Sequence, residues 1–246
     1  MKIALASAPV MNRNIDYNLQ AMVDYMKACS GKAELILFGE TALQGFDCLC
    51  WDYEKDKLMA VTLTDMIIQR VCDAARENRI AVSFGFIERD LDTLYSSQIF
   101  IGADGEIMNV FHRVSVGWKE YTKTDTHYCE GECFEKFQYG GKQFATGLCG
   151  DLWTDGRPNE MKALNADVVL WPVWCDYNPE EWNKSIKYEY AGQAALCGKE
   201  VLLVNPYCAD SGIKECAAGA CVHFQNGKIR DEHPAGNTGV LIIDVK

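Results

Sequence analysis

The pattern of hydrophobic and polar positions predicts a chain that alternates between strands and helices. Near the start, apolar residues recur at the spacing of an amphipathic helix. These residues are Leu19, Met22, Val23 and Met26. Continuous apolar runs, which are typical of strands buried on both faces, occur at residues 35–38, 168–171 and 201–204. Because each run follows a helical segment, we expect the two halves of the chain to be built alike.

The remaining periodicity predicts further elements and one antiparallel hairpin. Strands are expected at residues 2–8, 80–87, 95–101, 107–111, 144–149, 219–224 and 239–245, and helices at 62–78, 161–164 and 180–197. A tight turn at residues 103–106 joins two of these strands directly. Such a hairpin argues against a purely parallel doubly wound sheet, because parallel strands need crossover connections.

Composition narrows the class of protein. The chain has 246 residues, 48% of them hydrophobic, and no stretch resembles a linker, so we expect a single domain over residues 1–246. The net charge of -11 argues against nucleic acid and anionic membranes as partners. We find neither a signal peptide nor an apolar run of roughly 20 residues, and we expect a cytoplasmic protein with mostly reduced thiols.

The stretch from Phe144 to Trp153 is where we look first for chemistry. It is a short apolar run that carries Cys149 and Asp151 into a turn marked by Gly150. A cysteine placed there can attack a carbonyl group while the N–H of Gly150 faces the developing oxyanion. With twelve cysteines present, any one taken alone is structural by default. The cysteines form no CxxC pair and the four histidines do not cluster, so we expect no metal and no cofactor.

Two charged residues lie where a site is expected. Glu40 directly follows the buried run at residues 35–38, at the carboxyl end where α/β architectures place their sites. Arg113 follows the hairpin and begins a long loop with few strand or helix cues. Loops of this length inside compact domains are usually functional.

Several short segments in the same order resemble the carbon–nitrogen hydrolase, or nitrilase, superfamily. The segments that match the family's glutamate, lysine and cysteine motifs are Phe38-Gly-Glu40 with Gly45-Phe46, Gly105-Glu-Ile107 with Phe111-His-Arg113, and Leu148-Cys-Gly-Asp151. Later landmarks match at residues 167–172, 204–205 and 219–227. The resemblance covers nearly the whole chain.

This resemblance implies both a fold and an activity. The fold is α+β, a four-layer α-β-β-α sandwich of two mixed β-sheets with helices outside. Family members hydrolyse non-peptide C–N bonds, commonly in small amides or N-carbamoyl compounds, and usually assemble as homodimers or higher homo-oligomers. Their glutamate base, lysine and cysteine nucleophile correspond here to Glu40, Arg113 and Cys149.

The same three residue types follow from the chemistry of amide hydrolysis. A free thiol with a pKa of about 8.5 is mostly protonated at neutral pH. Glu40 can accept the thiol proton, protonate the leaving amine and later activate water. A cation beside the sulfur stabilises the oxyanion, and the Gly150 N–H supplies a second donor, each worth on the order of 3 kcal/mol.

Two positions depart from the family pattern. Arg113 stands where the family has lysine, and an arginine is larger, planar and unable to give up a proton. Lys119 in the following loop is the alternative cation, although it fits the alignment less well. A second family glutamate falls at Thr124, with Glu120 and Asp125 beside it.

We expect the pocket to be aromatic, with Phe46, Trp118, Trp153 and Trp174 as its candidate residues. The chain length favours an amidase-like over a true nitrilase activity. Two other hypotheses stay open at this point: a catalytically impaired relative that binds a small amide or carboxylate, and a metal or redox store built from the cysteines.

Overall fold

The first of two β-sheets has six strands in the order β13-β1-β3-β4-β5-β6. Its strands are β1 (Lys2–Ser7), β3 (Leu35–Leu37), β4 (Ala81–Asp90), β5 (Thr93–Ile101), β6 (Ile107–His112) and β13 (Gly239–Asp244). In this computed structural model, which describes residues 1–210 and 216–246, β1, β3 and β4 pair in parallel. The outer strands β5, β6 and β13 pair antiparallel, so the sheet is mixed.

The second sheet follows the order β12-β11-β10-β9-β8-β7, with β2 paired to β10. Its strands are β2 (Pro9–Val10), β7 (Lys136–Tyr139), β8 (Lys142–Thr146), β9 (Val168–Pro172), β10 (Glu200–Cys208), β11 (Ala218–Gln225) and β12 (Lys228–His233). The central strands β8, β9 and β10 are parallel, and the hairpins at either edge are antiparallel. This sheet is therefore also mixed.

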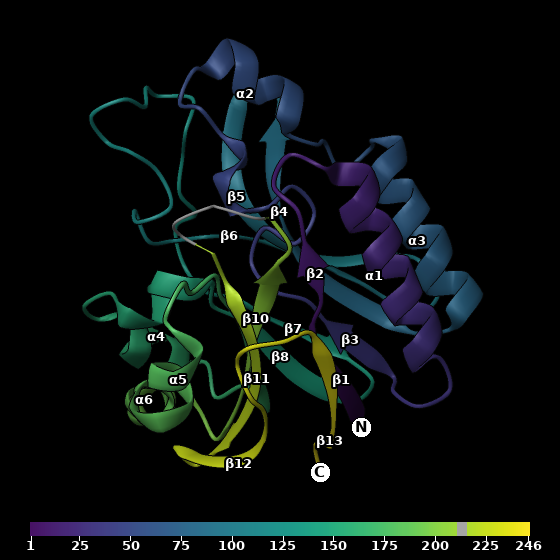
Figure 1. Cartoon of the computed structure of the whole chain (residues 1–246), viewed down its shortest axis with the longest axis vertical. Helices are drawn as coiled ribbons and strands as arrows, with labels where there is room; N and C mark the ends of the chain where they lie inside the picture. Colours follow the sequence, from purple (N-terminus) through teal and green to yellow (C-terminus); the bar gives the residue numbers. More distant parts are fainter. Residues whose placement is uncertain (211–215) are drawn as a thin grey trace.

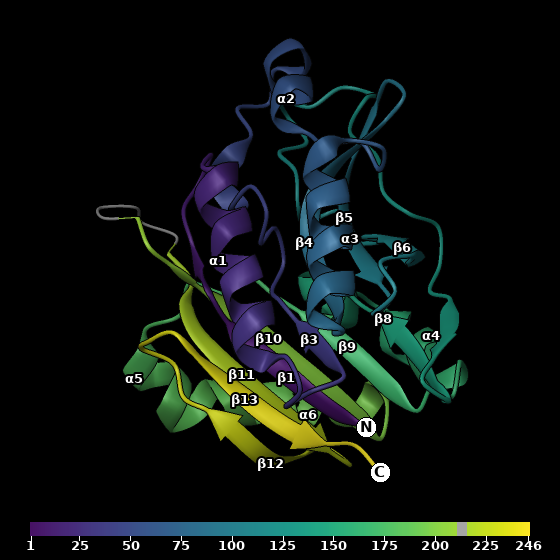
Figure 2. The same cartoon turned by 90° about the vertical axis from the view of Figure 1, so that its right-hand side faces the viewer.

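Helices cover the outer face of each sheet (Figure 1). On the first sheet lie α1 (Ile15–Cys29) and α3 (Met66–Asn78), and on the second lie α4 (Arg157–Ala163), α5 (Pro179–Glu181) and α6 (Lys187–Cys197). The short helix α2 (Tyr53–Met59) lies beyond the sheets at one end of the molecule, as Figure 2 also shows. Shorter helical turns are η1 (Phe46–Cys48), η2 (Cys149–Trp153) and the π-helical turn η3 (Trp182–Ile186).

Three apolar layers separate the four layers of secondary structure. One packs α1 and α3 against the first sheet, and another packs α4 and α6 against the second. The third lies between the two sheets and includes Leu5, Leu37, Phe100, Leu170 and Leu202. Strands between two such layers must be apolar on both faces, which explains the continuous runs in the sequence. The predicted four-layer α-β-β-α arrangement is confirmed.

Most predicted elements are present, but the strands β2, β7 and β12 were not predicted, and some predicted elements have other bounds. The helix expected from residue 62 begins at Met66, because the Asp65 side chain accepts a hydrogen bond from the Ile67 N–H and caps it. The strand expected over residues 144–149 ends at Thr146, so Cys149 begins the helical turn η2. The sequence pattern gave no sign of α2. No helix among the described residues is long and apolar enough to cross a membrane.

The turn after β3 lies unusually close to β4. A Cβ atom on Gly85 would lie 2.4 Å from the Thr41 backbone nitrogen and 2.8 Å from the Glu40 Cα. On the other side, a Cβ atom on Gly39 would lie 2.5 Å from the Pro206 ring. Thr41 itself has a positive φ of 48°, which is uncommon for a residue with a side chain. The backbone at Glu40 is thus fixed from both sheets.

We predict that Gly85→Ala destabilises the protein by about 1–3 kcal/mol, because the new methyl group forces this turn away from β4. The matched control is Gly192→Ala on α6, where a Cβ atom meets nothing within 4 Å. That control should leave stability unchanged or raise it by up to about 1 kcal/mol, since alanine favours a helix. Urea unfolding followed by circular dichroism measures both, and equal stability of the two variants would contradict the prediction.

Candidate active site

Glu40 lies at the carboxyl end of β3, between the two sheets. Its side chain is fully buried, and its backbone N–H donates to the Val173 carbonyl oxygen, just beyond β9, at 3.4 Å. Among the described residues, no N–H or O–H group reaches its carboxyl oxygen Oε2. A buried carboxyl oxygen without such a donor is costly unless something else occupies it. Glu40 therefore has one oxygen available for proton transfer.

Arg113 pairs directly with Glu40 although 73 residues separate them. It follows β6, is only 4% exposed, and donates from Nη1 to Glu40 Oε1 at 2.7 Å. Its Nε donates to Ser115 Oγ at 2.9 Å. Among the described residues, no acceptor bonds to its remaining nitrogen, Nη2, which lies beside Gly150. The guanidinium group is thus oriented by two bonds and has one nitrogen free for another ligand.

Asp151 joins the segment that carries Arg113 to the turn that carries Cys149. Its Oδ1 accepts the backbone N–H groups of Val114 and Ser115 at 3.1 and 2.7 Å, and its Oδ2 accepts that of Leu148 at 2.9 Å. The carboxyl group is completely buried, with the Nε of Arg113 4.0 Å away. These bonds fix the cation and the cysteine relative to each other.

Cys149 occupies a strained backbone position at the start of η2. Its φ of 42° lies in the left-handed region, which costs a residue with a side chain on the order of 1 kcal/mol. The Trp171 indole N–H donates to its carbonyl oxygen at 3.0 Å, and its own thiol donates to the Trp174 carbonyl oxygen at 3.8 Å. Cys149 is a partly exposed residue, and the bond from Trp171 holds its backbone.

Gly150 allows the guanidinium group to lie against the turn. A Cβ atom at this position would lie 2.7 Å from Arg113 Nη2 and 3.5 Å from Ser115 Oγ. Any side chain here would push the arginine away. Gly150 thus leaves room for the cation and adds its backbone N–H to the same region, next to Cys149.

The ionisation of these groups depends on burial and on one another. Burial, reinforced by the nearby Cys149, raises the pKa of Glu40 to about 8, although Arg113 acts in the opposite direction. A hydrogen bond to Cys175 and burial raise the pKa of the Cys149 thiol, and Arg113 opposes them. Burial raises the pKa of Asp151 to about 6. A carboxyl group that lies near a thiol and titrates near neutral pH is suited to take its proton.

The aromatic residues proposed for the pocket fall into separate groups. Trp174 stacks on Phe46 with ring centroids 5.6 Å apart, and the Trp174 carbonyl oxygen contacts the Cys149 thiol. Trp153 is 45% exposed and packs against Trp171 and Tyr190. Trp118 is buried in another cluster around Tyr128. Phe46 and Trp174 are therefore the pair that lies beside the cysteine.

The loop residues offered as alternatives make other contacts. Lys119 Nζ donates to the Tyr128 carbonyl oxygen and forms an ion pair with Glu130 at 2.8 Å. The Asp125 carboxylate accepts from the backbone N–H of His127 at 3.0 Å. Glu120 is exposed, and its carbonyl oxygen accepts a bond from Lys123. Arg113, rather than Lys119, is the cation that contacts Glu40.

Sequence reasoning missed four contributors to this site. Ser115 orients Arg113, Asp151 joins two loops, and Cys175 with Tyr190 lies next to the nucleophile candidate. Asp151 was visible in the sequence as part of the Cys-x-Asp segment, without a role. Nothing in the local pattern marks Cys175, because its proximity to Cys149 arises from the pairing of β8 with β9.

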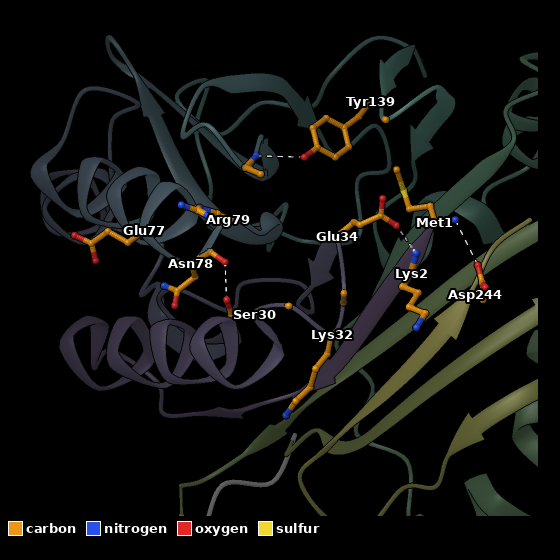
Figure 3. Close-up of a pocket in the computed structure, with 14 residues that line it drawn as sticks. Met1, Lys2, Ser30, Lys32, Glu34, Glu77, Asn78, Arg79, Tyr139 and Asp244 are labelled. Atoms are coloured by element: carbon orange, nitrogen blue, oxygen red, sulfur yellow. Dashed lines mark hydrogen bonds and ion pairs between the residues drawn. The ribbon is translucent and has the colours of Figure 1, made fainter.

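A separate groove lies at the opposite end of the strands. It has a volume of about 1040 Å³ and is lined by residues at the amino ends of β1 and β3, including Lys2 and Glu34 (Figure 3). The Met1 amino group there pairs with Asp244 at 3.4 Å, and the Lys2 backbone N–H donates to Glu34. None of the candidate catalytic residues lines this groove. The described residues also include no cluster of three or more potential metal ligands.

Comparison with known proteins gives the family. The chain matches the carbon-nitrogen hydrolase family model over residues 2–246. It is 34% identical over 144 residues to an arylacetonitrilase from Hypocrea virens, which covers 54% of this chain and 41% of that protein. It is 30% identical over 190 residues to a cyanide hydratase from Leptosphaeria maculans, covering 65% and 48%. The chain thus spans about half the length of these curated relatives.

Solved structures share the fold at lower identity. A variant of the amidase from Nesterenkonia sp., carrying acrylamide on its active-site cysteine, superposes with a TM-score of 0.82 at 19% identity, covering 100% of this chain and 93% of that one. A glutamine-dependent NAD+ synthetase from Acinetobacter baumannii gives a TM-score of 0.76 at 24% identity, covering 98% and 44%. These likenesses support the fold, and the family model matches almost every residue. The chain belongs to the carbon-nitrogen hydrolase family.

Proposed function

We propose that this protein hydrolyses the C–N bond of a small aliphatic amide or N-carbamoyl compound through a thioester on Cys149. One observation carries the proposal: a carboxyl group, a guanidinium group and a thiol from three distant segments interact in one buried site. Membership of the carbon-nitrogen hydrolase family supports the same reaction type. An amidase from Pseudomonas sp., described as (R)-stereoselective, is among the relatives, at 24% identity over 170 residues.

In the first half of the reaction, the Cys149 sulfur attacks the carbonyl carbon while Glu40 takes the thiol proton. This transfer accompanies the attack, because the raised pKa of Cys149 disfavours a free thiolate beforehand. Glu40 then donates the proton to the departing nitrogen, and ammonia or an amine leaves. In the second half, Glu40 removes a proton from water, which attacks the thioester and releases the acid.

Arg113 and Gly150 stabilise the oxyanion in both halves. The Nη2 of Arg113 lies beside Gly150, whose N–H belongs to the same turn as Cys149. In a buried site such donors act at low dielectric and need no reorganisation when charge develops. Arginine can occupy the family's lysine position here, because separate nitrogens bond to Glu40 and Ser115 and leave one for substrate.

The alternative is a catalytically impaired protein that binds a small amide or carboxylate, in which the ion pair with Glu40 withdraws Arg113 from catalysis. The unoccupied Nη2 argues against it. Homodimer assembly also stays a prediction from the family, and it would cover the exposed apolar residues on and beside α6. These residues are Trp153, Tyr177, Tyr188 and Leu196.

The experiment that tests the proposal measures ammonia release from short aliphatic amides and N-carbamoyl amino acids. Cys149→Ala should lower turnover at least about a thousandfold, since without the nucleophile only residual stabilisation remains. Cys197→Ala is the matched control, because this thiol is buried on α6 and bonds only to its own helix at Gln193. Unchanged turnover in Cys149→Ala, or no turnover of any such substrate by the native chain, would overturn the proposal.

The pH dependence of kcat/KM should report the ionisation of Glu40. Because burial raises the pKa of Glu40 to about 8, the base form is scarce below that value and accumulates above it. We therefore expect kcat/KM to rise with pH and level off above about pH 8, rather than near pH 5 as for an ordinary glutamate. Rates at constant ionic strength check this, and a plateau already reached at pH 6 would contradict the role given to Glu40.

Two substitutions of Arg113 test its positive charge and the shape of its guanidinium group separately. Arg113→Met should lower kcat by about a hundred- to a thousandfold, because an oxyanion donor is lost. Arg113→Lys should retain more activity than Arg113→Met, because it keeps a cation in the buried pair. Thermal unfolding must accompany the kinetics, since an unpaired Glu40 also destabilises the fold. Equal kcat in folded Arg113→Met and native protein would exclude Arg113 as the oxyanion donor.

A further inference from the structure

A second thiol lies beside Cys149 and has no part in the proposed hydrolysis. Cys175 follows β9, is 7% exposed, and belongs to the same apolar cluster against which Cys149 packs. The Cys149 thiol donates to the carbonyl oxygen of Trp174, the residue before Cys175, at 3.8 Å, and the Cys175 thiol lies near enough to raise the pKa of Cys149. Cys175 Sγ also lies 3.1 Å from the Tyr190 hydroxyl group on α6. This arrangement brings two sulfur atoms together inside the candidate active site.

The backbone holds both cysteines in place. The Cys175 N–H donates to Asn205 Oδ1 at 2.9 Å, and Asn205 Nδ2 returns a bond to the Cys175 carbonyl oxygen at 2.9 Å. On the other side, the Trp171 indole N–H bonds to the Cys149 carbonyl oxygen. Asn205 and Trp171 are both buried in the second sheet. The meeting of the two thiols therefore follows from the fold and not from one side-chain rotamer.

The two thiols differ in access to solvent. Cys149 is partly exposed, whereas Cys175 is buried behind it against Tyr190. Glu40 is placed to remove the proton of Cys149, and the positive charge of Arg113 favours its thiolate. Because the pKa of Cys149 is raised overall, its sulfur reacts as the proton passes to Glu40, and this partly exposed residue is the one that an oxidant reaches first. The shielded Cys175 can then react only with Cys149.

We propose that Cys149 and Cys175 form a reversible disulfide when the site meets hydrogen peroxide or a small organic hydroperoxide. The bond occupies the sulfur proposed as the nucleophile and stops hydrolysis. It also protects Cys149, because sulfinic and sulfonic acids, to which an unprotected sulfenic acid proceeds, are generally irreversible. Reduction by a thiol restores both groups.

The chemistry balances in two steps. The Cys149 sulfur attacks one peroxide oxygen, the O–O bond breaks, and a sulfenic acid forms while the other oxygen leaves as water or an alcohol. The Cys175 sulfur then attacks the Cys149 sulfur, an S–S bond forms, the S–O bond breaks, and the hydroxyl group leaves with the Cys175 proton as water. The two thiols lose two electrons and two hydrogens, and the peroxide accepts them.

A second cysteine pair provides an internal comparison. Cys216 lies beside Cys208, and its thiol donates to the Cys208 carbonyl oxygen at 3.7 Å. Among the described residues, the charged group that acts on this pair is Asp210, whose negative charge disfavours a thiolate. Cys149 instead has Arg113 close by. Proximity is thus common to both pairs, and the described charges that act on them differ in sign.

The test treats the fully reduced native chain with one molar equivalent of hydrogen peroxide and then blocks remaining thiols with N-ethylmaleimide. Intact mass should fall by two hydrogen atoms before blocking, and peptide mapping without reductant should find a Cys149–Cys175 bond. Dithiothreitol should reverse the change. Since the readout is mass and not turnover, the result stands whether or not the amidase proposal holds.

Variants test whether Cys175 protects Cys149 from irreversible oxidation or only lies near it. With two or more molar equivalents of hydrogen peroxide, one for each oxygen atom gained, Cys175→Ala should carry Cys149 to the sulfinic acid, which dithiothreitol does not reverse, while Cys216→Ala should behave as the native chain. If Cys175→Ala fails to fold, Cys175→Ser keeps a hydroxyl group for Tyr190 and serves the same purpose. A native chain that yields sulfinic Cys149 with a free Cys175, or that first joins Cys208 to Cys216, would overturn the inference.

Discussion

The buried ion pair between Glu40 and Arg113 is the interaction on which the rest of the site depends. Removing two charges from water costs several kcal/mol for each ion, and only close geometry with further hydrogen bonds offsets that cost. The pair has a separation of 2.7 Å, and Ser115 and Asp151 surround the arginine with additional polar contacts. Where Glu40 is ionised, above about pH 8, each partner therefore offsets the burial cost of the other, and neither can move far without leaving a charge unpaired.

Close backbone contacts between the sheets give this pair its place. Gly85 and Gly39 let the turn at Glu40 lie against β4 and Pro206, and Gly150 lets the turn at Cys149 lie against the guanidinium group. Asp151 then holds together the two segments that bear the cation and the cysteine. Because these contacts are made by backbone atoms and short side chains, small displacements in the sheets would change the distances among the reacting groups.

The arginine and the second cysteine both distinguish this site from a simple set of three residues. Three nitrogens of one planar group have separate directions, so Arg113 can bond to Glu40 and Ser115 while Nη2 stays free. Cys175 adds a thiol behind the nucleophile candidate, where Tyr190 and Asn205 fix it. The same electrostatic environment that prepares a sulfur for attack on a carbonyl group also exposes it to oxidation.

The sequence by itself indicated the family and the candidates Glu40, Arg113 and Cys149, because short ordered segments are local properties of the chain. The four layers followed from that resemblance. The sequence favoured Arg113 over Lys119 as the cation by alignment but left Lys119 as the alternative, since both lie in one stretch and only the tertiary structure decides which side chain turns toward Glu40. It also gave no sign that Cys175 faces Cys149. Residues 26 positions apart meet there because β8 and β9 lie parallel and side by side, a relation that no local pattern contains.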